Sequence, residues 1–443
     1  MPLILPGNVA SATASTGYDV DNSCRFNRAS SESLERTPGS AGNRRTFTFS
    51  CWFKLGNLAS SQSDYYQIFG GFDGSGNDGL WISDSDKLYI YLDSGERRIT
   101  NQVIRDPSAW YNAVLAIDTT QGTAANRIKL YLNGSEITSF STNSDPTLNY
   151  DSGVNDTSLQ NIGERVNDDY FDGYIAEAVL IDGLQLTPTS FGEFDTDGSP
   201  TIWKPIDVSG LTFGTNGFYL DFEDSSALGN DVSGNDNDFT VNNLDATDQA
   251  TDTPTNNFAT LNPLNFGHGS LSEGNLKWTA SAQVGNLAFG TIGIDMDVSN
   301  QFYWETKIEG GEIVIGIAPT TLRWNDTGRA GSYGYYSDGN KYSGTSASSY
   351  GASFTTNDII GVLVGNGTLT FYKNGASQGT AFSSLSGTYL PFLAEVGSTN
   401  SMNFGSPPYS ISSGNTDPEG YGNFEYSTNS GYALNTKNLA EYG

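Results

Sequence analysis

Apolar side chains recur at every second residue in many short segments of this 443-residue chain. In the segment 46–53, three phenylalanines and a cysteine share one face at this spacing. The segments 88–92 and 128–132 repeat the alternation, and the latter ends in Asn133-Gly134. Such a pair between strands is typical of a tight hairpin, because the turn needs positive φ at both central residues. We therefore predict a fold of short antiparallel strands.

Composition supports an all-β fold. Phe and Tyr number 24 each, against 3 Met, and Gly numbers 52. Regularly placed aromatic residues favour packed strands over disorder, and abundant glycine is typical of many turns. The length suits more than one domain. We expect two tandem antiparallel jelly-roll-type β-sandwiches joined by an ordered connector.

The net charge of −29 excludes partners that carry dense negative charge. Such a chain repels nucleic acid and anionic membranes. No segment reaches the run of about 18 apolar residues that a membrane span needs. Residues 1–16 lack a basic start, and Pro6 and Gly7 interrupt their apolar run, so we expect an extended arm rather than a signal peptide.

The region 17–200 contains a characteristic order of segments. These are 46–54, Trp110-Tyr111-Asn112-Ala113-Val114, Leu130-Tyr131-Leu132-Asn133-Gly134, Asn161-Ile162-Gly163 and Phe171-Asp172-Gly173-Tyr174-Ile175-Ala176-Glu177. Together they resemble the laminin-G-like branch of the concanavalin A-like lectin/glucanase fold, which implies a β-sandwich. Thr187 before Pro188 is typical of a helix N-terminus and predicts a short helix that ends near Phe194.

A second set of segments marks the region 266–406. They are Phe302-Tyr303-Trp304-Glu305-Thr306-Lys307-Ile308, Ile313-Val314-Ile315-Gly316, Asp358-Ile359-Ile360-Gly361-Val362, Phe371-Tyr372-Lys373-Asn374-Gly375 and Pro391-Phe392. Their order resembles a SPRY domain, whose family uses loops at one end of a bent sandwich to bind protein partners. Between the two sandwiches lies an Asp- and Asn-rich connector, 201–265, and a tail, 407–443, follows the second.

The whole arrangement resembles structural proteins of tailed bacteriophages, described as fibres, appendages or capsid decorations. The resemblance implies a place on the virion surface, other virion proteins as partners, a homo-oligomer, and recognition of a host-surface glycan or protein. The arm and the tail are then candidates for assembly contacts. A secreted bacterial adhesin is an alternative, and it would carry an export signal.

Catalytic motifs are sparse, so we expect no enzyme activity. His268 is the chain's single histidine, and it lies in a Gly-rich segment without a nucleophile elbow. A polysaccharide-degrading glycosidase on the lectin/glucanase fold is the alternative function. Such enzymes place acids on one strand as Glu-x-Asp-x-x-Glu. The nearest match, 193–198, ends in glycine.

The loop Asp73, Ser75, Asn77 and Asp78 alternates oxygen-bearing side chains that suit a hard cation. The segment 231–238 is a second oxygen-rich loop. Calcium is one interpretation of either loop, and a solvated turn is the other. We expect no other cofactor.

Aromatic side chains are the remaining candidates for binding. Trp52, Tyr89, Tyr91 and Tyr131 fall opposite the apolar face of their strands, where their rings either stack on sugars or are covered by the connector or a neighbouring subunit. In the SPRY-like region, Arg323, Trp324, Tyr333, Tyr335 and Tyr336 lie near expected binding loops. Aromatic residues beside an arginine are typical interface anchors.

The two cysteines, Cys24 and Cys51, both lie in strand-like apolar segments. We expect buried free thiols, and a disulfide between paired strands is the alternative.

Overall fold

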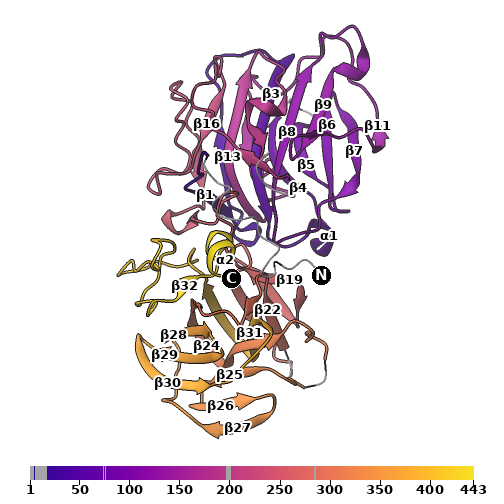
Figure 1. Cartoon of the computed structure of the whole chain (residues 1–443). Helices are drawn as coiled ribbons and strands as arrows, with labels where there is room; N and C mark the ends of the chain where they lie inside the picture. The colour runs from indigo at the N-terminus through magenta and orange to yellow at the C-terminus, as the bar shows by residue number, and fades with distance from the viewer. Residues whose placement is uncertain are drawn as a thin grey trace. The chain divides into compact units, whose positions relative to one another are not determined.

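The computed structural model describes residues 4, 17–72, 74, 76–195, 201–283, 286–326 and 328–443. The chain divides into two compact units, Thr16–Thr255 and Asn256–Gly443, and Ile4 belongs to the second of them. Both units consist mainly of β-strands (Figure 1), which confirms the predicted fold class. Among the described residues, no helix is long and apolar enough to cross a membrane.

The first unit is an antiparallel sandwich of two sheets (Figure 1). The inner-chain sheet has the order β10 (Ser135–Glu136), β9 (Ile128–Leu132), β8 (Trp110–Asp118), β3 (Thr46–Leu55), β13 (Gly173–Asp182), β1 (Ser23–Phe26) and β18 (Gln249–Ala250), with β16 (Phe218–Leu220) also paired to β13. The pocket sheet has the order β11 (Phe140–Asn143), β7 (Gly95–Val103), β6 (Lys87–Leu92), β5 (Asn77–Ile82), β4 (Tyr66–Phe72), β12 (Gln160–Ile162), β2 (Ser33–Arg36) and β17 (Thr240–Asn242).

Short elements complete this unit. They are the hairpin β14 (Gly192–Phe194) and β15 (Trp203–Pro205), the helix α1 (Ala59–Gln62), and the 3-10 turns η2 (Arg28–Ser30), η3 (Ala124–Asn126), η4 (Pro188–Ser190) and η5 (Ala246–Asp248). The predicted helix from Thr187 to Phe194 is therefore wrong beyond one turn. The chain extends into β14 after this turn, and Gly192 packs so tightly on the Trp203 indole that a Cβ would come within 2.5 Å of it.

The alternation seen in the sequence builds the core between the two sheets. Phe49 of β3 stacks on Phe69 of β4, with ring centroids 4.3 Å apart and planes at 13°. Burying one such side chain contributes about 2 to 3 kcal/mol. The Asn133-Gly134 turn has φ of 47° and 75° and joins β9 to β10, as predicted. Cys24 and Cys51 are buried and free.

The segment 201–255 is part of this first unit. It contributes β16 and β18 to one sheet and β17 to the other. Its side chains also cover the outer face of the inner-chain sheet, where Phe213 and Tyr219 pack with Val114 and Val179. Of the predicted connector 201–265, residues 201–255 are thus ordered and packed against the first sandwich, and 256–265 belong to the second unit.

Two buried ion pairs attach the end of this segment to the sandwich. The Lys54 Nζ lies 2.6 Å from Asp252 Oδ2, and both side chains are almost fully buried. The Trp110 indole N–H donates to the second Asp252 oxygen at 3.0 Å. Arg25 of β1 pairs with Asp248 at 3.3 Å. Because each buried charge has a partner of opposite sign, the desolvation of both is offset.

A third buried carboxylate, Glu177, lies on the outer face of β13. Its backbone has φ of 51°, at a bulge where the pairing with β3 shifts register. Its carboxyl accepts hydrogen bonds from Tyr219 Oη at 2.9 Å and from Tyr18 Oη at 3.3 Å. Burial raises the pKa of Glu177 to about 8, and the two hydroxyls oppose this rise in part.

The second unit is a bent antiparallel sandwich. Its main path runs through β19 (Leu261–Phe266), β22 (Asn286–Gly290), β31 (Thr388–Asn403), β24 (Gln301–Pro319), β25 (Tyr333–Tyr336), β26 (Asn340–Ser343) and β27 (Ser346–Ser349). The other elements are β20 (Gly269–Ser272), β21 (Lys277–Ala280), β23 (Ile294–Asp295), β28 (Ile359–Gly365), β29 (Thr368–Lys373), β30 (Ala376–Phe382), β32 (Tyr432–Ala433) and the helix α2 (Thr436–Tyr442).

The long strand β24 serves both layers of this unit. Its first half pairs with β28 and its second half pairs with β25. Between the halves, the register against β31 shifts around Gly310 and Gly311, and Gly311 has φ of 82°. The bend therefore lies where glycine relieves the backbone.

The tail 407–443 packs on the second unit. The strand β32 pairs in parallel with the start of β24, so that Phe302 lies beside Tyr432. The buried Glu305 carboxyl accepts from the backbone N–H groups of Glu425 and Tyr426 at 3.0 and 2.8 Å. Ile4 also pairs with this unit, through a parallel bridge to Ile292. The unit is thus assembled from widely separated parts of the chain.

The buried pair Lys54–Asp252 gives a first prediction. Lys54→Met leaves Asp252 without its cation, so the free energy of unfolding of the first unit should fall by about 3 kcal/mol. Urea titration followed by tryptophan fluorescence measures this. Lys129→Met removes a cation from the exposed pair with Glu136 and should change stability by less than about 1 kcal/mol. Equal losses in the two variants would contradict the assigned role.

The raised pKa of Glu177 predicts how the free energy of unfolding changes with pH. The folded carboxyl keeps its proton to about pH 8, whereas an ordinary glutamate loses it near 4.5. The folded state therefore binds more protons between these values, and the free energy of unfolding should fall as pH rises through them. The fall should be roughly 2 kcal/mol between about pH 6 and pH 9. Glu177→Gln should remove this part of the pH dependence.

The control for this prediction is Glu193→Gln, because Glu193 is an exposed glutamate of the same unit. Its pH profile should match that of the unmodified chain. A Glu177→Gln profile with an unchanged slope would show that Glu177 is ionised in the folded state at neutral pH.

Candidate ligand-binding site

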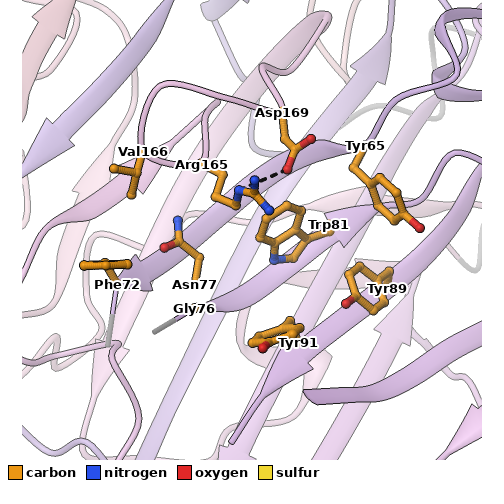
Figure 2. Close-up of a pocket in the computed structure, with 10 residues that line it drawn as sticks. All are labelled: Tyr65, Phe72, Gly76, Asn77, Trp81, Tyr89, Tyr91, Arg165, Val166 and Asp169. Carbon is orange, nitrogen blue, oxygen red and sulfur yellow. Dashed lines mark ion pairs between the residues drawn. The ribbon is translucent and has the colours of Figure 1, made fainter. Parts of the chain in front are cut away.

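The outer face of the pocket sheet carries a pocket of about 510 Å³ (Figure 2). Strands β4, β5 and β6 form its floor, and the loop 163–170 forms one wall. Its lining residues are Tyr65, Phe72, Gly76, Asn77, Trp81, Tyr89, Tyr91, Arg165, Val166 and Asp169. Five of these ten residues are aromatic, as is typical of a site for an organic ligand.

Strand alternation places the central rings on this face. In β5 and β6, Leu80, Ile82, Leu88 and Ile90 point into the core. Their neighbours Trp81 and Tyr89 therefore point outward, and the two lie directly opposite each other in the ladder. Tyr91 follows two residues later on the same face and lies opposite Gly79, which has no side chain to fill the space beside it.

The rings meet edge to face. Trp81 and Tyr89 have centroids 6.0 Å apart with planes at 67°, and Tyr89 and Tyr91 lie 6.5 Å apart at 70°. Tyr65, which precedes β4, joins the group 5.9 Å from Tyr89. In Figure 2 the four rings surround one side of the pocket. Rings at such angles present several π faces to one volume instead of one flat platform.

The loop 163–170 brings a cation over the rings. The Arg165 guanidinium carbon lies 5.8 Å from the centroid of the Trp81 ring. Its nitrogens pair with Asp169 at 3.2 Å (Figure 2) and with Asp168 at 3.1 Å. The backbone of Val166 has φ of 39° and that of Asn167 has φ of 68°. A β-branched residue in this conformation is strained, and such strain clusters at functional sites.

One donor in the pocket has no partner. The Trp81 indole nitrogen is buried, and no acceptor for it lies among the residues that the structure describes. The Trp81 side chain is 4% exposed. Asn77 instead donates its amide to Gln67 Oε1 at 3.1 Å. An unpaired buried N–H costs free energy, so a ligand oxygen or a water molecule that accepts this hydrogen bond would be stabilised.

Burial also shifts the pKa of the acid that lines the pocket, Asp169. It raises the pKa of Asp169 to about 6, while the Arg165 charge opposes this rise. Burial likewise raises the pKa of Tyr89, and the charge of Glu96 adds to the effect. At neutral pH the pocket therefore holds a neutral Tyr89 hydroxyl and a largely ionised Asp169 beside the Arg165 guanidinium.

The structure separates the four aromatic residues predicted in the first sandwich. It brings Tyr89 and Tyr91 together in the pocket. Trp52 lies on the other sheet and is buried, with Trp203 from the segment 201–255 packed in the same cluster. Tyr131 packs partly buried in the cluster around Tyr219. The connector thus covers Trp52 and Tyr131, the second of the two alternatives left open by the sequence.

The structure also separates the residues of the second unit that were predicted to bind a partner. Trp324 is 36% exposed and contacts His268 edge to face at 5.7 Å. Arg323 donates to the carbonyl groups of its own loop. Tyr333 packs against Phe382 at 4.9 Å, and Tyr336 donates to Glu312.

Tyr335 was predicted near a binding surface but lies in the core. Its ring is fully buried in the core of the second unit, where it contacts Phe354 and Phe371. Because Tyr333–Tyr336 is a regular strand, alternate residues turn inward, and Tyr335 is one of them. Tyr335 therefore contributes to packing and is not available at a surface.

The predicted cation loop is described in part. Asp73 and Ser75 lie outside the described residues. Asn77 and Asp78 are consecutive in β5 and point to opposite faces, and Asp78 accepts hydrogen bonds from Tyr150 and from the backbone of Gly153. In the second loop, the Asp231 carboxylate accepts hydrogen bonds from the backbone N–H groups of Tyr219, Ser233 and Asn237. Within the described residues, no three His, Cys, Asp or Glu side chains gather as metal ligands.

Comparison with known proteins identifies both domains. Residues 29–189 match the concanavalin A-like lectin/glucanases superfamily, and residues 301–407 match the SPRY domain. The chain therefore carries a concanavalin A-like domain followed by a SPRY domain, as the motifs predicted.

The curated relatives match one part of the chain. Ran-binding protein 9 of Xenopus tropicalis is 37% identical over 121 residues, which make up 24% of this chain and 22% of the relative. The Ran-binding proteins 9/10 homolog of Drosophila melanogaster is 34% identical over 120 residues, or 24% of this chain and 12% of the relative. The chain thus spans 22% or less of the length of these two relatives.

A solved structure aligns over a larger share. The crystal structure of a putative carbohydrate binding protein from Bacteroides ovatus is 16% identical and covers 51% of this chain and 59% of its own, with a TM-score of 0.34. The SPRY domain of human HERC1 is 17% identical and covers 32% of this chain, with a TM-score of 0.28.

Proposed function

We propose that this is a non-enzymatic recognition protein whose concanavalin A-like domain binds a sugar ring in the aromatic pocket. The observation that carries the proposal is the group formed by Trp81, Tyr89 and Tyr91, together with the buried Trp81 indole N–H, which has no acceptor among the described residues. A pyranose has an apolar face that packs on aromatic rings and hydroxyl oxygens that accept hydrogen bonds. The pocket offers both kinds of contact at once.

The alternative function is glycoside hydrolysis, and the pocket contains few of the groups that this reaction needs. Retaining and inverting mechanisms both need two carboxyl groups on either side of the scissile bond. Asp169 is the one carboxylate among the ten residues that line the pocket, and it pairs with Arg165. We therefore infer binding without turnover.

For the SPRY domain we infer a protein partner. Curated relatives that match 24% of the chain are named Ran-binding proteins. The exposed Trp324 beside Arg323 supplies an aromatic anchor and a cation on one loop. Such residues are enriched at the energetically important centres of protein interfaces.

We further infer that the protein is a virion component, either a fibre, an appendage or a capsid decoration of a tailed bacteriophage. The support is the order of arm, laminin-G-like sandwich, connector, SPRY domain and tail, which resembles such proteins. Its partners would be other virion proteins and further copies of the chain, and its location the virion surface. The strong net negative charge of −29 suits a protein displayed at high local concentration.

The sugar-binding proposal predicts the effect of removing a ring. Tyr91→Ala should weaken oligosaccharide binding at least about tenfold, because one wall of the site is lost. Titration followed by tryptophan fluorescence measures the dissociation constant, since Trp81 lies in the pocket. Tyr131→Ala removes a comparable ring from the opposite sheet and should leave binding unchanged. Equal weakening by both variants would place the sugar elsewhere.

A second measurement separates binding from catalysis. The chain should release no new reducing ends from any oligosaccharide that it binds, even over a long incubation. Release of reducing ends that Asp169→Asn abolishes would contradict the proposed function and support the hydrolase.

The virion proposal predicts self-assembly. Light scattering of the purified chain should give the mass of a discrete oligomer. Loss of that oligomer in EDTA would assign a structural cation to the assembly. A monomer with and without EDTA would contradict a symmetric appendage.

A further inference from the structure

We propose that the sugar recognised by the aromatic pocket carries a positively charged amino group, as a de-N-acetylated hexosamine unit does. This inference rests on the proposed sugar-binding function and names the chemical class of ligand. Three observations carry it: a cation already placed on the rings, the angles between the rings, and the balance of charge around them.

The free protein already places a cation in this site. The Arg165 guanidinium lies over the Trp81 ring, 5.8 Å from its centroid. A cation at this distance is attracted by the negative face of the ring. The site therefore stabilises positive charge in its unliganded form, and an ammonium group of the ligand would find the same environment beside the neighbouring rings.

The angles between the rings favour a compact cation over a flat sugar face alone. Tyr89 is inclined to Trp81 by 67°, to Tyr91 by 70° and to Tyr65 by 59°. Several aromatic faces thus border one space, as in the aromatic cages that hold ammonium groups.

The charges around the pocket favour a cation as well. The carboxylates of Asp84, Glu96 and Asp169 all act on the Tyr65 hydroxyl. Arg165 is the one cation among the ten residues that line the pocket, and it is already paired with Asp168 and Asp169. Lys87 occupies the same face of β6 but does not line the pocket. An acidic sugar would be repelled by these carboxylates, whereas an amino sugar would be attracted to them.

The unpaired indole N–H distinguishes an amino sugar from a simple ammonium ion. The Trp81 nitrogen is buried, with no acceptor among the described part of the chain. A hydroxyl or ring oxygen of a sugar can accept from it, while the amino group lies among the tyrosines. The ligand therefore needs an acceptor oxygen next to a cationic nitrogen, and a hexosamine carries both on one ring.

The test compares matched oligosaccharides on the intact chain by calorimetric titration near pH 7, where Asp169 is largely ionised. Glucosamine oligomers should bind about tenfold tighter than N-acetylglucosamine oligomers of equal length, because acetylation removes the charge. The difference should shrink as salt is raised from about 0.05 M to about 0.5 M. Choline, a cation without a sugar ring, should bind more weakly than the glucosamine oligomer.

Arg165→Gln provides the decisive variant. Removing the resident cation leaves Asp168 and Asp169 unpaired, so the glucosamine oligomer should bind several-fold tighter. The N-acetylated oligomer should change little. Arg45→Gln is the matched control, because Arg45 pairs with an exposed aspartate in the same unit but does not line the pocket. It should leave both affinities unchanged.

The outcomes separate this inference from the function on which it rests. If N-acetylated or uronic acid oligomers bind as tightly as the amine form, or if Arg165→Gln weakens the amine form, the cationic ligand is wrong while sugar binding stands. If choline equals the glucosamine oligomer, the site recognises ammonium without a sugar. If no saccharide of any charge binds the folded chain, the proposed function itself fails.

Discussion

The buried ion pair between Lys54 and Asp252 fixes how the first unit is completed. It joins a central strand to a segment almost two hundred residues later, in surroundings from which water is excluded. An unpaired charge there would cost several kcal/mol, so the two residues hold each other in register. With Asp252 in place, β18 pairs with β1 and the chain before it is drawn across the outer face of the sheet. Arg25 on β1 and Asp248 form a second buried pair, two strands away from Lys54 on β3.

That covering gives the two sheets opposite roles. The inner-chain sheet has Trp203, Phe213 and Tyr219 packed over its outer face, so its outward aromatic residues become a second, smaller core. Among the described residues, those that line the pocket from outside the strands of the pocket sheet come from the loop 163–170 and from Tyr65 and Gly76. The same kind of residue therefore packs on one side of the sandwich and lines a pocket on the other. Which role a ring takes depends on where the segment 201–255 runs.

This dependence explains how much of the fold and of the site could be predicted from the sequence. Alternation is a local property, so it predicted the strands, the Asn133-Gly134 hairpin and the outward placement of Tyr89 and Tyr91. It also placed Trp81 beside them, and a comparison of the 80–82 and 88–92 patterns could have added it to the site. Tyr65, Arg165 and Asp169 come from loops, and nothing in their neighbourhoods predicts that they meet β5. Trp52 and Tyr131 looked the same as Tyr89 because long-range covering leaves no local pattern.

The pairing of Ile4 with Ile292 and of Phe302 with Tyr432 has a consequence for the order in which the chain matures. The first sandwich is complete by residue 255, so it can fold while the rest is still being synthesised. The SPRY-containing unit must bring together segments that precede and follow that sandwich. Contacts at such separation in sequence form slowly, since the intervening chain has to be closed first. During synthesis, β24 therefore spends an interval with an unpaired edge, and such an edge is open to mispairing with another chain.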